Sequence, residues 1–293
     1  MPKETTKTPE SPPAEQVLNI PLELIHPFEG HPFKVLDDEL MQQTIDSFAQ
    51  YGVLNPVIVR PDGDGYEMVS GHRRLRASEL AGKETIPAIS RDMTDDEAII
   101  FMVDSNLQRE SLLPSERAFA YSMKMDALKH QGKQLELTSS QLGTKLRADE
   151  MIAAQAGSSR TQVQRFIRLT ELIPELLDMV DRRELAFNPA VELSYLTKPE
   201  QRMFIEAMDY AQATPSLSQA QRLKKLSQEG ACTQEAMFSI MSEEKKSELD
   251  RITIRHDVLR KYFPKSYTPQ QMEQTIIRLL DQWQKKRERQ QER

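Results

Sequence analysis

The feature that most limits the possible folds is a change of hydrophobic pattern near residue 110. Between residues 17 and 110, short apolar runs alternate with segments whose apolar residues recur at helical spacing. This alternation is typical of an α/β unit, in which helices cover a sheet. Beyond residue 110 the pattern is almost entirely helical. The sequence therefore predicts an α+β protein, with a small α/β domain followed by helical regions.

The expected division of the chain follows from this change. The first 16 residues are rich in Pro, Thr, Glu and Lys and have almost nothing to bury, so we expect a disordered tail over 1–16. At 293 residues, the chain is long enough for two or three domains. We predict an α/β domain over 17–110, a helical domain over 111–212 and a helical C-terminal region over 213–293.

Individual elements can be assigned within the α/β segment. In the first predicted helix, Asp37 or Asp38 is the expected N-cap, and Leu40, Ile45 and Phe48 are expected to share the buried face. Two glycines in residues 61–65 predict a tight turn between two strands. Strands are predicted over 17–25, 55–60, 66–70 and 86–90, and helices over 37–52, 70–82 and 94–108.

Net charge and cysteine content narrow the possible functions. A formal charge of −6 argues against a protein coated with basic charge, so a nucleic-acid site must be a local basic face. The single cysteine, Cys232, cannot form an internal disulfide, and no Cys and His cluster has zinc-site spacing. No stretch approaches the roughly 20 apolar residues that span a bilayer. We therefore expect a cytoplasmic protein without a membrane partner.

The stretch SGHRRLRA, residues 70–77, is the first candidate site. It lies where a predicted strand meets a helix, and the unpaired N–H groups at a helix start attract anions. Gly71 lets a phosphate approach the backbone, and Arg73 and Arg74 add forked donors. The alternative is that these arginines are solvated or pair with carboxylates such as Asp95 and Asp96.

A second candidate site lies in residues 148–170. A short apolar helix, a turn at Gly157 and a second helix led by Ser158 or Ser159 form a candidate helix-turn-helix. Residues 145–170 contain five basic and only two acidic residues, as a DNA-binding face requires. The alternative is an ordinary helical hairpin with a solvated basic face. Val163, Phe166, Ile167 and Leu169 can face inward, which leaves the candidate DNA contacts Ser158, Ser159, Arg160, Thr161, Gln162, Gln164, Arg165 and Arg168.

Two further segments have distinct patterns. Residues 131–147 are polar and contain Gly132 and Gly143, which predicts a loop over the helical domain. In the last predicted helix, four apolar residues form a heptad-like stripe, which favours dimerisation or packing onto the chain's own domain. The stripe consists of Met272, Ile276, Leu279 and Trp283.

Four stretches together resemble the ParB family of chromosome and plasmid partition proteins. In order, they are GVLNPVIVRP, VSGHRRLRASELAG, SNLQRESLLPSERAFAY and AGSSRTQVQRFIRLTELIPELLDMV. The resemblance implies a ParB/sulfiredoxin-like domain that binds CTP with Mg²⁺, a helix-turn-helix domain for a palindromic centromere-like DNA site, and C-terminal dimerisation. It also implies a clamp that CTP closes, a ParA-type ATPase partner and a nucleoid-associated location. The pattern is similar to versions carried by conjugative plasmids and integrative elements.

The family's nucleotide motifs can be carried over residue by residue, and two positions depart from them. His72 stands where the family usually has Glu. Ser105 stands where a Glu linked to metal-assisted hydrolysis is common, so CTPase activity is expected to be weak or absent. The implied nucleotide-binding residues are Ser70, Gly71, His72, Arg73, Arg74, Arg76, Asn106, Gln108 and Arg109.

Two other classes of protein are alternatives to this interpretation. One is a DNA-binding transcriptional regulator of the same fold without a nucleotide switch. The absence of a carboxylate at Ser105 is the feature that favours this alternative. The other is an enzyme. Sulfiredoxin activity is excluded because its chemistry needs a cysteine where this chain has Gly71 and His72. A ParB-like nuclease would need a cluster of carboxylates or histidines to bind metal ions, and the sequence shows no such cluster.

Overall fold

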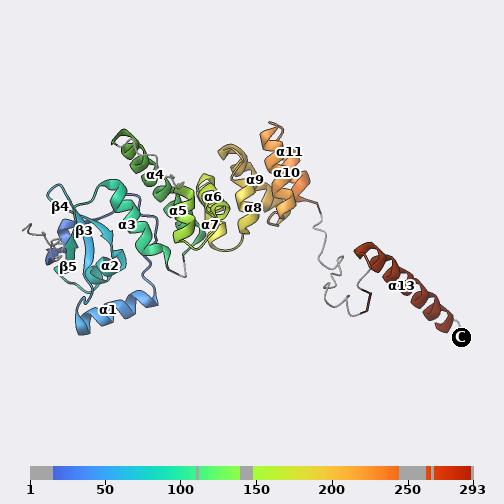
Figure 1. Ribbon diagram of the computed structural model, residues 1–293, viewed down its shortest axis with the longest axis horizontal. Helices are drawn as coiled ribbons and strands as arrows, with labels where there is room; N and C mark the ends of the chain where they lie inside the picture. The colour runs from blue at the N-terminus through green and yellow to red at the C-terminus, as the bar shows by residue number, and fades with distance from the viewer. Residues whose placement is uncertain (1–15, 110–111, 139–147, 244–261, 265–266, 292–293) are drawn as a thin grey trace, which may run out of the picture. The chain divides into compact units, whose positions relative to one another are not determined.

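The structure is a computed structural model that describes residues 16–109, 112–138, 148–243, 262–264 and 267–291 (Figure 1). Residues 1–15 of the tail predicted over 1–16 lie outside the described residues, as do Lys145 and Arg147 among the basic residues near the helix-turn-helix. The chain divides into two compact units, residues 1–243 and 244–293. Each unit is described by itself.

The N-terminal part of the first unit is built on a mixed five-stranded sheet, in the order β1-β5-β3-β4-β2. β1 pairs antiparallel with β5, β5 parallel with β3, β3 antiparallel with β4, and β4 parallel with β2. The strands are β1 (Val17–Pro21), β2 (Ile25–Pro27), β3 (Val57–Asp62), β4 (Gly65–Ser70) and β5 (Thr85–Ser90). This sheet confirms the predicted α/β domain.

The single strand predicted over 17–25 is two strands at opposite edges of the sheet. A short 3-10 helix, η1 (Leu22–Leu24), separates β1 from β2. The crossing segment passes so close to Gly65 that a Cβ there would lie 2.7 Å from the Leu24 carbonyl oxygen. Sequence pattern alone cannot distinguish one apolar run from two short strands, because both alternate in the same way.

Helices cover both faces of the sheet. Met68 and Val69 are both fully buried although they are adjacent in β4, since successive side chains point to opposite faces. The Met68 face packs against Leu75 of α2 (His72–Leu80), and the Val69 face packs against α3 (Asp95–Leu107). Met41 of α1 (Glu39–Tyr51) packs in turn against α2.

The start and end predicted for α1 are confirmed, but one residue of its buried face is not. Asp38 is the N-cap, since its carboxylate accepts from the Met41 N–H at 2.9 Å, and Gly52 ends the helix with φ of 72°. Leu40, predicted to be buried, is 62% exposed, and Met41 is buried in its place. The side chain one position later faces α2, which the sequence pattern does not specify.

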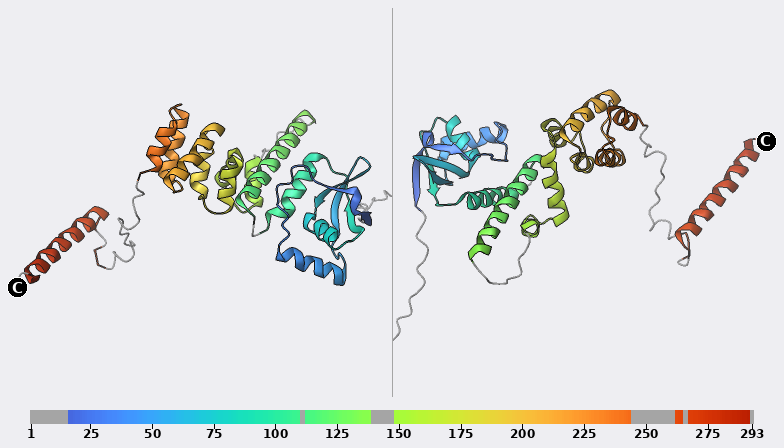
Figure 2. Two further views of the ribbon diagram at one scale, coloured as in Figure 1. Left: turned by 180° about the vertical axis from the view of Figure 1, so that it is seen from behind. Right: turned by 90° about the horizontal axis from the view of Figure 1, so that it is seen from above.

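The rest of the first unit is helical. Tyr121 and Met125 of α4 pack with Ile152 of α5 and Val163 of α6, while a larger core spans α7 to α11. The helices are α4 (Pro114–Thr138), α5 (Ala148–Gln155), α6 (Arg160–Arg168), α7 (Pro174–Asp181), α8 (Phe187–Leu193), α9 (Lys198–Ala211), α10 (Leu217–Gln228) and α11 (Gln234–Met241), with a 3-10 turn η2 (Leu169–Glu171) after α6. Figure 2 shows the same order of helices from two further sides.

Two predictions for this helical part need correction. Residues 131–138 are the last turns of α4 and not a loop, while 139–147 lie outside the described residues.

Helices α10 and α11 lie beyond the boundary predicted at residue 212, yet Leu223 and Met237 share one buried core with Phe204 of α9. Apolar contacts therefore join residues 213–243 to the preceding helices.

The second unit contains α13 (Pro269–Gln291). Met272 is buried, whereas Ile277, Leu279 and Leu280 are each more than half exposed. No helix within the described residues is long and apolar enough to cross a membrane.

Candidate functional site

A cavity of about 140 Å³ lies at the N-terminus of α2. Three separate segments of the chain line it: the segment between β2 and α1, the junction between β4 and α2, and the end of α3. Its lining residues are His31, Phe33, Lys34, Val35, Ser70, Gly71, His72, Arg73, Arg74, Ser105, Asn106 and Arg109.

The structure brings together most of the residues that the sequence assigned to nucleotide binding. Two of them do not line this cavity: Gln108, and Arg76, which bonds to Asp37 at 2.9 Å and to Glu79 at 3.3 Å. The lining residues that sequence reasoning missed are His31, Phe33, Lys34 and Val35. They have no periodic pattern, and only the sheet topology brings them beside α2.

Gly71 permits the sharp turn from β4 into α2. Its φ of 116° lies in the left-handed region, where a side chain is strained. A Cβ at this position would also lie 2.7 Å from Val57 Cγ1 and 3.1 Å from the guanidinium of Arg74. Glycine is therefore required both by the backbone and by the close packing behind the cavity.

The arginines of α2 have different partners. Arg73 donates to the Asp38 carboxylate at 2.9 Å, which joins α2 to the start of α1. Arg74 donates to the carbonyl oxygens of Asn55 and Pro56 at 2.8 and 2.7 Å. The alternative that these arginines pair with carboxylates therefore holds for Arg73 and Arg76, but not with the expected partners, since Asp95 and Asp96 bond to Arg60 and His130.

Arg109 is the cavity cation without a bonded partner. Its side chain is exposed and forms no hydrogen bond or ion pair with any described residue. Burial and the positive charge of Arg73 lower the pKa of Arg109, and Glu116 opposes this. Burial and the charge of Arg109 likewise lower the pKa of Arg74. These shifts are expected where like charges converge, and an anion would relieve them.

Two histidines stack on each other in the cavity wall. The ring centroids of His31 and His72 are 3.6 Å apart, and the Nε2 atom of each is buried without a hydrogen-bond partner. Burial, followed by the charges of His31 and Arg109, lowers the pKa of His72 to about 3. Burial also lowers the pKa of His31 to about 4, although a backbone hydrogen bond to Phe33 opposes the shift. Both rings are therefore neutral at pH 7.

The end of α3 contributes neutral polar groups. Ser105 donates to the Met102 carbonyl oxygen at 2.9 Å and accepts from the Ser70 hydroxyl at 3.3 Å. The Asn106 amide donates to the same carbonyl at 2.8 Å. Ser105 therefore places a hydroxyl at the cavity, and not a carboxylate.

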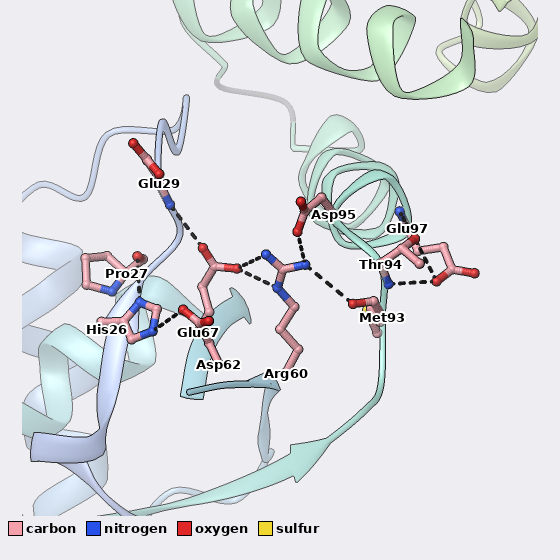
Figure 3. A network of polar contacts seen from close by, with 10 residues as sticks. All are labelled: His26, Pro27, Glu29, Arg60, Asp62, Glu67, Met93, Thr94, Asp95 and Glu97. Carbon is pink, nitrogen blue, oxygen red and sulfur yellow. Dashed lines mark hydrogen bonds and ion pairs between the residues drawn. The ribbon is translucent and has the colours of Figure 1, made fainter. Parts of the chain in front are cut away.

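A buried ion pair holds the elements around the cavity in place (Figure 3). Arg60 of β3 bonds to the Glu67 carboxylate of β4 through two nitrogens, each at 2.6 Å, and reaches Asp95 at the start of α3 at 2.6 Å. Glu67 also accepts from the Glu29 N–H at 3.3 Å. This network fixes both the segment that carries His31 and the helix that carries Ser105.

The donor set of the cavity does not fit the Mg²⁺ ion that the ParB resemblance implies. Mg²⁺ prefers carboxylate and phosphate oxygens in octahedral geometry. Among the described lining residues there is no Asp or Glu, and the charged ones are all cations. No group of three or more His, Cys, Asp or Glu within the described part of the chain could hold a metal ion.

The second candidate site has helix-turn-helix geometry. α5 ends before Gly157, whose φ is 58°, and α6 begins after Ser159, whose hydroxyl accepts from the Gln162 N–H at 3.2 Å. Val163 is fully buried against α4 and α5. The predicted inward face of the second helix is thereby confirmed.

The outward residues of α6 are not all free. Asp149 accepts from Arg160 at 2.6 Å and from Gln164 at 3.0 Å, which ties the two helices of the motif together. Arg165 donates to Asn188 of α8 at 2.6 Å. Arg168 donates to the Ser194 carbonyl oxygen at 2.7 Å and lies over the Tyr195 ring. Of the remaining predicted contacts, all exposed or partly exposed, Ser159 caps α6, and the side chains of Ser158, Thr161 and Gln162 make no bond to another described residue.

The N-terminal part of the chain matches a known family model. Residues 6–107 match the family model of the ParB N-terminal domain. The chromosome-partitioning protein Spo0J of Thermus thermophilus is 36% identical over 188 residues, which covers 64% of this chain and 63% of that protein. The chain thus spans less than two thirds of the length of this curated relative.

Two solved structures of C-terminally truncated ParB from Caulobacter crescentus are also similar. One, complexed to the centromeric parS site, is 24% identical with a TM-score of 0.42 and covers 71% of this chain and 98% of that one. The other, complexed with CTP-gamma-S, is 26% identical with a TM-score of 0.31 and covers 63% of this chain and 94% of that one.

The fold defines an α+β protein in which a domain with a mixed five-stranded sheet precedes an all-helical region with a helix-turn-helix. The match over residues 6–107 and the similarity to Spo0J relate the chain to chromosome-partitioning proteins. Residues 6–107 of this chain match the ParB N-terminal domain, and the chain is similar to chromosome-partitioning proteins.

Proposed function

We propose that this protein is a CTP-responsive, site-specific DNA-binding protein of the partition type. The observation that carries the proposal is the cavity at α2, where Arg74 and Arg109 converge and Arg109 has no bonded partner among the described residues. Guanidinium groups match phosphate oxygens geometrically, and a helix N-terminus favours negative charge. The choice of CTP among nucleotides follows from the ParB resemblance.

The nucleotide part of the proposal is tested by calorimetry with CTP, ATP and GTP. We expect CTP to bind most tightly and Arg109→Ala to weaken its binding by about tenfold or more, since a charged hydrogen bond to phosphate is lost. Arg76→Ala is the matched control, because it removes the same charge outside the cavity. Equal affinity for all three nucleotides would overturn the CTP-responsive proposal in favour of the alternative, a DNA-binding regulator without a nucleotide switch.

The proposal that α6 reads DNA rests on its place in the helix-turn-helix. In this motif the second helix lies in the major groove, where Arg and Gln can reach base edges. Thr161 and Gln162 are at its N-terminal end, and Arg165 is one turn further along. The predicted contacts with a palindromic, centromere-like site remain a proposal.

Crosslinking and sequencing of bound DNA in the native host would supply the target site. The same experiment shows whether the protein serves a chromosome, a plasmid or an integrative element. On that site, Arg165→Ala is expected to reduce affinity by about 1 to 3 kcal/mol. Arg222→Ala, an exposed charge on α10, is the control. Undiminished affinity of the Arg165 variant at moderate salt would remove this residue from the DNA interface.

We further propose a homodimer that CTP closes into a clamp and a ParA-type ATPase as partner, in the cytoplasm at the nucleoid. The exposed apolar residues of α13, among them Leu279 and Leu280, support dimerisation. Leu279→Glu should convert dimers to monomers in sedimentation experiments. Because Ser105 supplies no carboxylate, CTP hydrolysis should be weak or absent.

A further inference from the structure

The charges around the α2 cavity are strongly unbalanced. Its described lining contains the four cations Lys34, Arg73, Arg74 and Arg109 and no carboxylate. Two carboxylates close to these residues are already engaged. Asp38 accepts from Arg73 and from the Met41 N–H. Glu116 is buried and accepts from the backbone N–H groups of Lys34 and Leu113, at 2.7 and 2.9 Å.

Two of the four cations are not neutralised by a bonded carboxylate. Lys34 lies 3.3 Å from Asp181, and Arg73 bonds to Asp38. Arg74 donates only to backbone carbonyl oxygens, and Arg109 makes no described bond. Bringing a dication beside these guanidiniums would be opposed by Coulomb repulsion, whereas an ionised triphosphate would be attracted by both.

The neutral groups of the cavity do not reverse this preference for an anion over a dication. The hydroxyls of Ser70 and Ser105 and the amide of Asn106 are uncharged, and they partly satisfy one another. His72, which stands where the ParB family usually has a carboxylate, is stacked on His31. Uncharged oxygens alone are poor ligands for Mg²⁺, which relies on carboxylates and phosphates.

Building on the proposed function, we propose that the cavity binds the triphosphate of CTP without a metal ion. Arg74 and Arg109 supply the positive charge that Mg²⁺ would otherwise bring, and Ser105 is the position where the missing metal ligand would stand. Addition of Mg²⁺ should leave CTP affinity unchanged or weaken it, because the metal competes with the guanidiniums for the same phosphate oxygens.

The test is calorimetric titration of the full chain with CTP, once in excess EDTA and once in saturating MgCl₂. We expect dissociation constants that agree within about threefold, or a weaker one with Mg²⁺. A dissociation constant at least about tenfold tighter with Mg²⁺ overturns the metal-free proposal but not CTP binding itself. Absence of binding in both buffers overturns the proposed function as well.

Two variants test whether the absence of a carboxylate in the cavity is the reason for metal-free binding. Ser105→Glu places a carboxylate at an exposed position of the cavity, so its CTP binding should become tighter with Mg²⁺ than in EDTA. Glu110 follows Arg109 and lies outside the described residues, so Glu110→Gln is measured in the same two buffers. Its affinities should match those of the unmodified chain. If Glu110→Gln abolishes a dependence on Mg²⁺ that the unmodified chain shows, the metal is bound by that carboxylate and the proposal fails.

Discussion

Acidification should destabilise this protein through the stacked pair His31 and His72. Both imidazoles are neutral in the folded protein, with pKa values of about 4 and about 3, whereas an exposed imidazole has a pKa of 6.5. Between the folded-state pKa values of about 3 to 4 and the exposed value of 6.5, the unfolded chain therefore binds more protons than the folded one. It follows that the free energy of unfolding is highest above pH 6.5 and falls as pH decreases toward 4.

The size of the effect follows from the same shifts. A group that gains one proton only on unfolding changes the free energy of unfolding by about 1.4 kcal/mol for each pH unit. Between pH 7 and pH 5, each histidine should contribute about 2 kcal/mol of lost stability, or about 3 to 4 kcal/mol for the pair. This is a large part of the stability of an ordinary domain.

The assay is urea denaturation followed by circular dichroism at several pH values between 7.5 and 5, with His31→Gln/His72→Gln as the comparison. Glutamine is polar but does not titrate, so the double variant should lose about 3 kcal/mol less over this range than the unmodified chain. All other titrating groups are common to both proteins and cancel in the difference. Equal losses would refute the conclusion that these imidazoles are held neutral.

Three further predictions concern the supports of the cavity and are measured by the same denaturation at pH 7. Gly71→Ala should lower the free energy of unfolding by about 2 to 3 kcal/mol and abolish CTP binding, because it adds strain at positive φ and a clash behind the cavity. Glu67→Ala should lower the free energy of unfolding by about 3 kcal/mol, since it removes the buried carboxylate that bonds two nitrogens of Arg60 and leaves only the exposed Asp95 as its charged partner. Asp95→Ala, at an 85% exposed carboxylate, should lower it by less than about 1 kcal/mol. Lys124 is 1% exposed and bonds to Asp104, so Asp104→Ala should lower the free energy of unfolding by about 3 kcal/mol. Lys124→Met should lower it far less, because it leaves no buried charge.

Local sequence determined the elements whose signals lie within a few residues. Asp38 caps α1, Thr94 forms a capping box with Glu97 in α3, and Gly71 opens α2 at positive φ. Each depends on backbone geometry that nearby side chains set directly. The order of four stretches also predicted a resemblance to the ParB family, and residues 6–107 match the ParB N-terminal domain.

Tertiary structure decided which of the arginines face the cavity. Arg73, Arg74 and Arg76 are close together in the sequence, but Arg76 lies beyond the first turn of α2 and bonds to Asp37 outside the cavity lining. Nothing in the local pattern separates Arg76 from the other two. Its direction depends on where α1 packs, which is a contact between residues nearly 40 positions apart.

The remaining cavity wall came from the topology of the sheet. β1 and β2 lie at opposite edges, so the segment that follows β2 carries His31 and Lys34 to the start of α2 and to the end of α3. The sequence by itself determined a cluster of arginines after a glycine and a hydroxyl at residue 105. Only the folded chain paired Arg73 with Asp38 and Arg76 with Asp37, and left Arg74 beside two neutral histidines in a cavity whose described lining has no carboxylate. These charges converge through contacts between distant segments.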